Sequence, residues 1–258
     1  MKSFLAHSAS SLLLVLLCQL PVAAATLSVR ADSWPPYNGD PSAVAPGYMI
    51  EVLQEIFSPQ GVTIDYKVMP WKRAISDVQN GTFDAVVGSD PEETPGLIFP
   101  KENFGVNLNG LYVKAGTTWR FTGAESLSQV RLGAIDGYSY SGRVDDYLAR
   151  NRGGKQVFLA TGDDALDKLL KMLQSGRIDA IIENVNVMTY TLRGAGLENQ
   201  VVSAGVNEQG RLPLYVAFSP RNTQAITYAR NFDEGIVRLR KSGKLKEILA
   251  TYGLKDWK

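Results

Sequence analysis

The chain has 258 residues, with 27 lysines and arginines against 26 aspartates and glutamates and a formal net charge of +1. A charge-balanced chain without a basic run argues against nucleic-acid binding and against electrostatic docking on a membrane surface. Apolar residues make up 45% of the sequence, which is ordinary for a globular protein.

The N-terminal residues have the pattern of a secretory signal peptide. Lys2 supplies the positive start, residues 12–17 are apolar, and Ala23-Ala24-Ala25 form a small-residue cleavage site. The apolar stretch ends at Pro21 and is too short to span a bilayer. We therefore expect export with cleavage after Ala25 (residues 1–25 removed), and no direct membrane insertion of the mature chain.

Cleavage removes the only cysteine, Cys18, and the only histidine, His7. The remaining chain can form no disulfide, has no Cys or His nucleophile, and has no Cys/His zinc site. No carboxylate spacing typical of a calcium-binding loop occurs in it either. We expect neither a metal nor a cofactor.

Hydrophobic periodicity and turn residues predict an alternation of strands and helices that becomes purely helical near the C-terminus. In chain order, the predicted elements are a strand at 26–30, a helix at 48–57, a strand at 62–68, a helix at 71–78, strands at 85–87, 111–113 and 130–135, a helix at 144–150, a strand at 157–160, a helix at 166–173, strands at 180–182 and 214–218, and helices from 225 to 242 and from 245 to 252.

One pattern occurs twice, as VQNGTFDAVVGS at residues 78–89 and as LQSGRIDAIIEN at residues 173–184. Each copy follows a run with apolar residues three and four positions apart, typical of one helix face. Each then has a glycine suited to the helix end and an apolar run typical of a strand buried in a parallel sheet. The doubling predicts two small α/β lobes with a ligand cleft between them.

The predicted lobes follow from where the chain crosses between them. The strands at 111–113 and 214–218 are the expected crossings, and therefore the hinge strands. Lobe 1 would then comprise residues 26–113 plus 219–258, and lobe 2 residues 114–213.

The repeated strands also predict binding residues. Ligands of open α/β sheets bind beyond the carboxyl ends of the parallel strands. This rule places Ser89 and Asp90 at the cleft in one lobe and Glu183 and Asn184 in the other. Asp84 and Asp179 precede the repeated strands, away from the cleft end, so we expect them to make structural hydrogen bonds.

Five further residues are candidate ligand contacts. Trp34 and Tyr37 lie in a proline-rich loop after the first strand, where they either wall a pocket or cover the lobe's core. Arg73 lies near a helix start, where its positive charge is unfavourable because the helix dipole is positive at that end. It either holds an anionic group or is a solvated surface arginine. Ser139 and Tyr140 precede a helix whose N-terminus could receive a carboxylate.

Several segments together resemble a known family over nearly all of residues 26–258. They are the loop Trp34-Pro35-Pro36-Tyr37, the helix start Gly47-Tyr48-Met49-Ile50-Glu51, GTFDAVVGS, the strand and turn from Gly133 to Gly137, GRIDAII, and the ending SGKLKEILATYGL. The chain resembles the family 3 bacterial extracellular solute-binding proteins, which are receptors of the amino-acid-binding kind.

The resemblance implies an α/β protein with the two-lobed periplasmic binding protein fold of type II. Each lobe would be a small, mostly parallel sheet flanked by helices, and two hinge strands would let the lobes close on a ligand. The resemblance also implies a periplasmic, monomeric receptor for a small polar solute, an amino acid or a related compound, with an ABC-transporter permease in the inner membrane as its partner.

Two positions depart from the amino-acid receptors of this family. A Thr-Pro-Glu-Arg stretch in those receptors supplies an arginine for the ligand carboxylate, whereas Glu93 stands there in Asp90-Pro91-Glu92-Glu93. An aspartate in those receptors holds the ligand ammonium group, whereas this chain has Asn184, preceded by Glu183. The carboxylate of Glu93 accepts hydrogen bonds where the guanidinium group of an arginine would donate them to the ligand carboxylate. The identity of the ligand therefore stays open.

A transport receptor needs no catalytic residues, and we expect none here. Two other functions are alternatives to this one. Some relatives with this fold are periplasmic cyclohexadienyl or prephenate-type dehydratases, which need a general acid, and Glu183 or Glu93 would serve here. A ligand-sensing accessory subunit is the other alternative.

Overall fold

The structure is a computed structural model that describes residues 25–258. The predicted signal peptide lies outside the described residues, apart from Ala25, the first residue of β1. Within residues 25–258, no helix combines the length and the apolar character needed to cross a bilayer.

Ten strands and seven α-helices, with three short 3-10 helices, alternate along the described chain. The strands are β1 (Ala25–Ala31), β2 (Val62–Val68), β3 (Ala85–Ser89), β4 (Gly105–Asn107), β5 (Asn109–Lys114), β6 (Leu132–Ile135), β7 (Val157–Ala160), β8 (Ala180–Asn184), β9 (Val201–Val206) and β10 (Leu212–Phe218). The helices are α1 (Tyr48–Phe57), α2 (Trp71–Gln79), α3 (Arg143–Arg150), α4 (Ala165–Gln174), α5 (Val185–Ala195), α6 (Ala225–Ser242) and α7 (Lys244–Thr251), and the 3-10 helices are η1 (Ser58–Gln60), η2 (Ala124–Gln129) and η3 (Glu208–Gly210).

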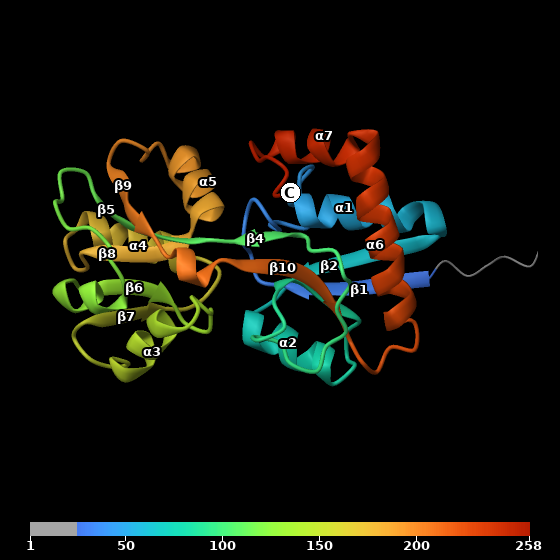
Figure 1. Ribbon diagram of the computed structural model, residues 1–258, viewed down its shortest axis with the longest axis horizontal. Coiled ribbons are helices and arrows are strands. Elements are labelled where there is room, and N and C mark those ends of the chain that lie inside the picture. Colours follow the sequence, from blue (N-terminus) through green and yellow to red (C-terminus); the bar gives the residue numbers. More distant parts are fainter. Residues whose placement is uncertain (1–24) are drawn as a thin grey trace, which may run out of the picture.

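The strands form two separate five-stranded sheets with the same internal plan. The first sheet has the order β2-β1-β3-β10-β4 and the second β7-β6-β8-β5-β9. In each, the first three strands are parallel, and an antiparallel strand then joins them to the last strand. Figure 1 shows the two sheets, each with its own helices, side by side along the long axis. We call the first sheet with its helices lobe 1 and the second lobe 2.

The two copies of the repeated pattern occupy equivalent places in the two lobes, as predicted. The first copy runs from α2 into β3 and the second from α4 into β8, and both strands are third in their sheets. Asp84 Oδ2 accepts the backbone N–H of Ser28 at 2.8 Å, and Asp179 Oδ2 accepts that of Arg131 at 2.9 Å. The predicted structural role of both aspartates is thereby confirmed: each joins its strand to the strand beside it.

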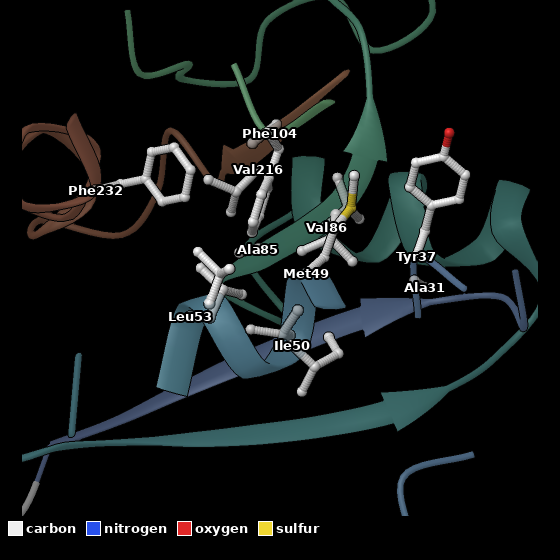
Figure 2. Close-up of a cluster of buried hydrophobic side chains, with 14 of the residues drawn as sticks. Ala31, Tyr37, Met49, Ile50, Leu53, Ala85, Val86, Phe104, Val216 and Phe232 are labelled. Atoms are coloured by element: carbon white, nitrogen blue, oxygen red, sulfur yellow. The ribbon is translucent and has the colours of Figure 1, made fainter. Parts of the chain in front are cut away.

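The core of lobe 1 lies between its sheet and the helices α1 and α6. Figure 2 shows Ile50 and Leu53 of α1, Phe232 of α6, and Val86 and Val216 of the sheet within one cluster of side chains. All five side chains are almost completely buried. Burying one such side chain stabilises the fold by about 1.5–3 kcal/mol, so the apolar stripe of α1 fixes that helix on the sheet.

The core of lobe 2 occupies both faces of the second sheet. Ile182 of β8 packs with Leu132 and Val113 on one face, and Ile181 packs with Leu169 of α4 on the other. Because successive side chains of a strand point to opposite faces, both isoleucines are buried only if both faces are covered. The continuous apolar run of the repeated pattern thus fits a central strand.

The crossings between the lobes differ from the predicted hinge strands. Residues 111–113 lie within β5, held between β8 and β9, and residues 214–218 lie within β10, which pairs with β3 and β4. Backbone hydrogen bonds therefore fix each segment within a single sheet, residues 111–113 in the second and residues 214–218 in the first. The chain passes between the sheets at Leu108 and through residues 207–211. Closure of the lobes about these segments stays a prediction.

The strands β4 and β9, the helix α5 and the three 3-10 helices were not predicted. Helix α5 begins directly after β8, so no loop separates the helix from the strand. Its first turns contain β-branched residues, which obscure the helical pattern. The signal that could have found it is Asn184, a favoured N-cap residue, followed by Met188 and Leu192 four positions apart on the buried face.

Candidate functional site

A cavity of about 470 Å³ lies between the lobes. Lobe 1 contributes the loop after β1 and the start of α2, and lobe 2 contributes the segments after β6 and β7, the end of β8 and one face of α5. The lining residues are Asp32, Ser33, Trp34, Pro35, Pro70, Trp71 and Lys72 from lobe 1, and Ile135, Asp136, Tyr138, Thr161, Gly162, Asp163, Ala165, Leu166, Asp167, Glu183, Val187 and Thr191 from lobe 2. The cavity therefore sits at the carboxyl ends of parallel strands, where α/β sheets bind ligands.

Trp34 forms an aromatic wall of this cavity. Its ring stacks on Tyr37 with centroids 4.4 Å apart and meets the edge of Tyr138 at 6.3 Å. Tyr37 is buried behind Trp34, and its hydroxyl donates to Asn184 Oδ1 of lobe 2 at 3.2 Å. Of the two aromatic residues predicted in this loop, Trp34 reaches the cavity, whereas Tyr37 supports it from behind.

Glu183 brings a buried carboxyl group to the cavity from lobe 2. Only 1% of the residue is exposed. Oε1 accepts the backbone N–H of Asn184 at 2.7 Å and the indole N–H of Trp34 at 3.3 Å, while Oε2 has no hydrogen-bond partner among the described residues. Burial raises the pKa of Glu183 to about 7, so near neutral pH the group holds a proton part of the time.

Two more acidic groups lie close by in lobe 1. Asp32 accepts a hydrogen bond from the hydroxyl of Tyr138 across the cleft, and burial raises its pKa to about 6. Glu93 accepts the indole N–H of Trp71 at 2.8 Å, and burial raises its pKa to about 7. Glu93 lines a small recess of about 30 Å³ that shares Asp32, Trp71 and Tyr138 with the main cavity. Asp32 was not predicted, although it follows β1 just as Asp90 follows β3.

The remaining charges at the cavity are mostly negative. Asp136, Asp163 and Asp167 line the lobe 2 side. Lys72 is the only basic side chain among the described lining residues, and its Nζ lies 3.7 Å from Asp136 Oδ1. The lysine thus pairs with an acidic neighbour across the cleft.

Two predicted contacts lie away from the cavity. Arg73 is 73% exposed and pairs with Asp77 one turn further along α2, with Nε and Oδ2 3.4 Å apart. A surface partner therefore replaces the anionic ligand expected for this arginine. Tyr140 is completely buried in the core of lobe 2, where its hydroxyl accepts the backbone N–H of Ile135 at 2.8 Å. It stabilises the loop that carries Tyr138, the neighbour that does line the cavity.

The residues that end the repeated strands differ in their placement. Ser89 is fully buried, and Asp90 Oδ1 accepts the backbone N–H groups of Glu92 and Glu93, so both residues shape the loop rather than line the cavity. Asn184 caps α5, and its amide also donates to Asn107 of lobe 1 at 2.9 Å.

Ser139 reaches the recess, where its hydroxyl donates to Asp145 at 2.9 Å. Trp34, Ser139 and Glu183 are therefore the predicted residues at the candidate site, and ligand contact by any of them stays a prediction.

A family model described as bacterial extracellular solute-binding proteins, family 3, matches residues 27–91. The chain resembles that family. The matched residues run from β1 through β3 and include the aromatic loop and the start of α2, which line the cavity. No curated protein sequence matches the chain.

Solved structures similar to this one cover both lobes. An ancestral arginine-binding protein bound to arginine is 20% identical, with a TM-score of 0.72 over 88% of this chain and 97% of that one. A substrate-binding protein of an ABC uptake transporter from Streptococcus pneumoniae, with bound histidine, is 19% identical, with a TM-score of 0.71 over 88% and 92%.

An ancestral amino-acid-binding protein, described as a precursor of cyclohexadienyl dehydratase, is 18% identical, with a TM-score of 0.69 over 88% and 95%. These likenesses confirm the predicted type II periplasmic binding protein fold. The sheets are mixed, however, since each has as many antiparallel as parallel pairings.

Proposed function

We propose that this protein is a periplasmic receptor that binds a small polar solute between its lobes and delivers it to the permease of an ABC importer. The observation that carries the proposal is the cavity of about 470 Å³, lined from both lobes at the carboxyl ends of parallel strands. This size is typical of small-molecule sites. The family match over residues 27–91 supports both the solute-binding role and the periplasmic location.

Side-chain contacts across the cleft support a mechanism of lobe closure. Trp34 and Asp32 of lobe 1 bond to Glu183 and Tyr138 of lobe 2, and Tyr37 bonds to Asn184. All these contacts would be lost if the lobes separated. The two crossing segments run side by side, with Asn107 of β4 paired to Leu212 of β10, so rotation about them would open the cleft.

Thermal-shift screening of the chain without residues 1–25 tests the receptor function. The panel contains amino acids, amines, dicarboxylates and ring acids. A ligand at 100 times its dissociation constant should stabilise the protein by about 2.7 kcal/mol, and X-ray scattering should then show a smaller radius of gyration. A panel in which no compound raises the melting temperature would contradict the proposal.

The observation that favours a second function is the raised pKa of Glu183. A carboxyl group with a pKa of about 7 inside a cavity suits a general acid, as a dehydratase acting on a ring acid requires. The negative lining argues against this function, since prephenate carries two carboxylates. Incubation with prephenate should leave it unchanged apart from its slow spontaneous decay, and enzymatic formation of phenylpyruvate would favour the dehydratase.

A further inference from the structure

We propose that the cavity selects a small organic cation that has no carboxylate, namely a diamine or a guanidine-bearing amine. This inference rests on the proposed receptor function and names the ligand class of the same site. It stands on four observations: the charge of the lining, an unpartnered buried oxygen, the aromatic surfaces, and the prior use of backbone N–H donors in three segments at the cleft.

The first observation is the charge of the lining. Five carboxyl groups line the cavity and belong to Asp32, Asp136, Asp163, Asp167 and Glu183. The only basic group among the described lining residues, Lys72, is already paired with Asp136, which also accepts two hydrogen bonds from Arg152. The other four carboxyl groups have no basic partner among the described lining residues. A cleft lined by one sign of charge focuses its field on the ligand and raises the local concentration of the opposite charge.

The second observation is Oε2 of Glu183, a buried oxygen without a hydrogen-bond partner among the described residues. Buried polar atoms in folded proteins nearly always have such a partner. Oε1 of the same carboxyl group is satisfied by Trp34 and the backbone of Asn184, which fix the group in place. An ammonium or guanidinium group provides the donor that Oε2 lacks, in a charge-assisted hydrogen bond.

The third observation concerns the aromatic side chains at the site. Trp34, Trp71 and Tyr138 line the main cavity. The indole N–H groups of both tryptophans donate to carboxylates, to Glu183 and Glu93 respectively, and are not left for an anionic ligand. The ring faces of these residues attract cations through the cation–π interaction.

The fourth observation is that the backbone N–H donors of three segments near the cleft are already occupied. The N-terminus of α3 would be the natural place for a ligand carboxylate. The carboxylate of Asp145 uses donors of the loop that leads into α3: it accepts the backbone N–H groups of Tyr140 and Ser141, at 2.8 Å and 2.9 Å, and the hydroxyl of Ser139. A carboxylate of this chain thus already binds donors that this loop would otherwise offer to a ligand carboxylate.

The other two loops at the cleft show the same arrangement. After β3, the carboxylate of Asp90 accepts the backbone N–H groups of Glu92 and Glu93. After β8, the side chain of Asn184 accepts the first free N–H groups of α5. At these three segments a ligand carboxylate would therefore find the donors already used, and it would also meet the negative charge of the lining. A ligand that lacks the carboxylate avoids this penalty.

Three matched ligand pairs test the inference, because the members of each pair differ by one carboxylate. They are putrescine and ornithine, cadaverine and lysine, and agmatine and arginine. Isothermal titration calorimetry at pH 8 and low salt should show at least one amine binding at least tenfold more tightly than its amino-acid partner. Amino acids that bind as tightly as their amines would overturn the inference, and so would dissociation constants above 1 mM for all three amines.

Substitutions locate the binding in the cavity. Glu183→Gln should weaken amine binding at least tenfold. Asp163→Asn, at an exposed position on the cavity rim, should weaken it several-fold without affecting the fold. Glu234→Gln, on the exposed face of α6, is the matched control and should bind as the wild type does. Unchanged amine binding in both cavity variants would place the cation elsewhere and refute the proposal.

The outcomes separate this inference from the receptor function. If ornithine, lysine or arginine binds and the amines do not, the receptor function stands and the inference fails. If the protein converts prephenate, the receptor function fails whatever the amines do.

Discussion

Glu183→Gln should remove a specific part of the pH dependence of stability of the ligand-free protein. Burial raises the pKa of Glu183 from 4.5 to about 7, so between these values the folded protein holds a proton that the unfolded chain has released. The stability contributed by this proton is fully present below about pH 4.5. It is lost as the pH rises through about 7, because the buried group must then carry a charge.

The size of the effect follows from the two pKa values. Between them, each pH unit changes the free energy of unfolding by up to about 1.4 kcal/mol. For a group that titrates at 4.5 when unfolded and at about 7 when folded, the loss between pH 5 and pH 8 is about 2.5 kcal/mol. Solvent screening does not reduce this value much, since Glu183 is only 1% exposed.

Urea unfolding at pH 5, 6, 7 and 8 measures this loss. The comparison needs three proteins without residues 1–25: the wild type, Glu183→Gln, and Glu234→Gln as the surface control. Asp32 is close to Glu183 and titrates in all three proteins, so the difference between wild type and Glu183→Gln isolates Glu183. That difference should change by about 2.5 kcal/mol across the range. Parallel curves would refute the assigned pKa and the burial that explains it.

Three further predictions concern binding and stability. Agmatine should bind more tightly as the pH rises from 6 to 8, because a cation favours the ionised forms of Glu183 and Asp32; calorimetry in two buffers of different ionisation enthalpy should detect the released protons, and pH-independent binding would contradict this. Trp34→Ala should weaken agmatine binding by about tenfold, since the cation–π contact and the support of Glu183 are both lost, and equal affinity by fluorescence or calorimetry would count against an aromatic wall. Asp84→Asn and Asp179→Asn should each lower the free energy of unfolding by about 1–3 kcal/mol without changing ligand affinity; a selective loss of affinity would show that these aspartates do more than join strands.

Much of the fold was predictable because it depends on local patterns. Helix α1 and strand β2 have the predicted bounds, since their apolar residues follow a clean helical or strand period. The doubled sequence pattern predicted two similar α/β lobes, and the structure has two sheets in which the repeated strands are both third. The crossings were misplaced because an apolar strand looks the same in sequence whether it joins two lobes or lies within one.

The candidate site was predictable only in part. The rule for strand ends located the correct loops but not the side chains that point into the cavity. Tyr138 faces the cavity while Tyr140, two residues later, is buried in the core, and only the path of the loop decides which one does so. The position of Arg73 near a helix start predicted that it binds an anionic ligand group. In the structure it forms an ion pair with Asp77, one turn away on the surface of α2.

The sequence alone determined that the chain is close to neutral and that it folds as two similar α/β lobes. The charge of the cavity was decided by tertiary structure. One of its carboxyl groups, Asp32, comes from lobe 1, and the other four come from three segments of lobe 2, after β6, after β7 and at the end of β8. They share one cavity because the sheet of lobe 2 brings its strand ends together and lobe 1 faces them across the cleft. Composition averages charge over the whole chain, whereas a ligand experiences the field of the few groups that the fold brings together.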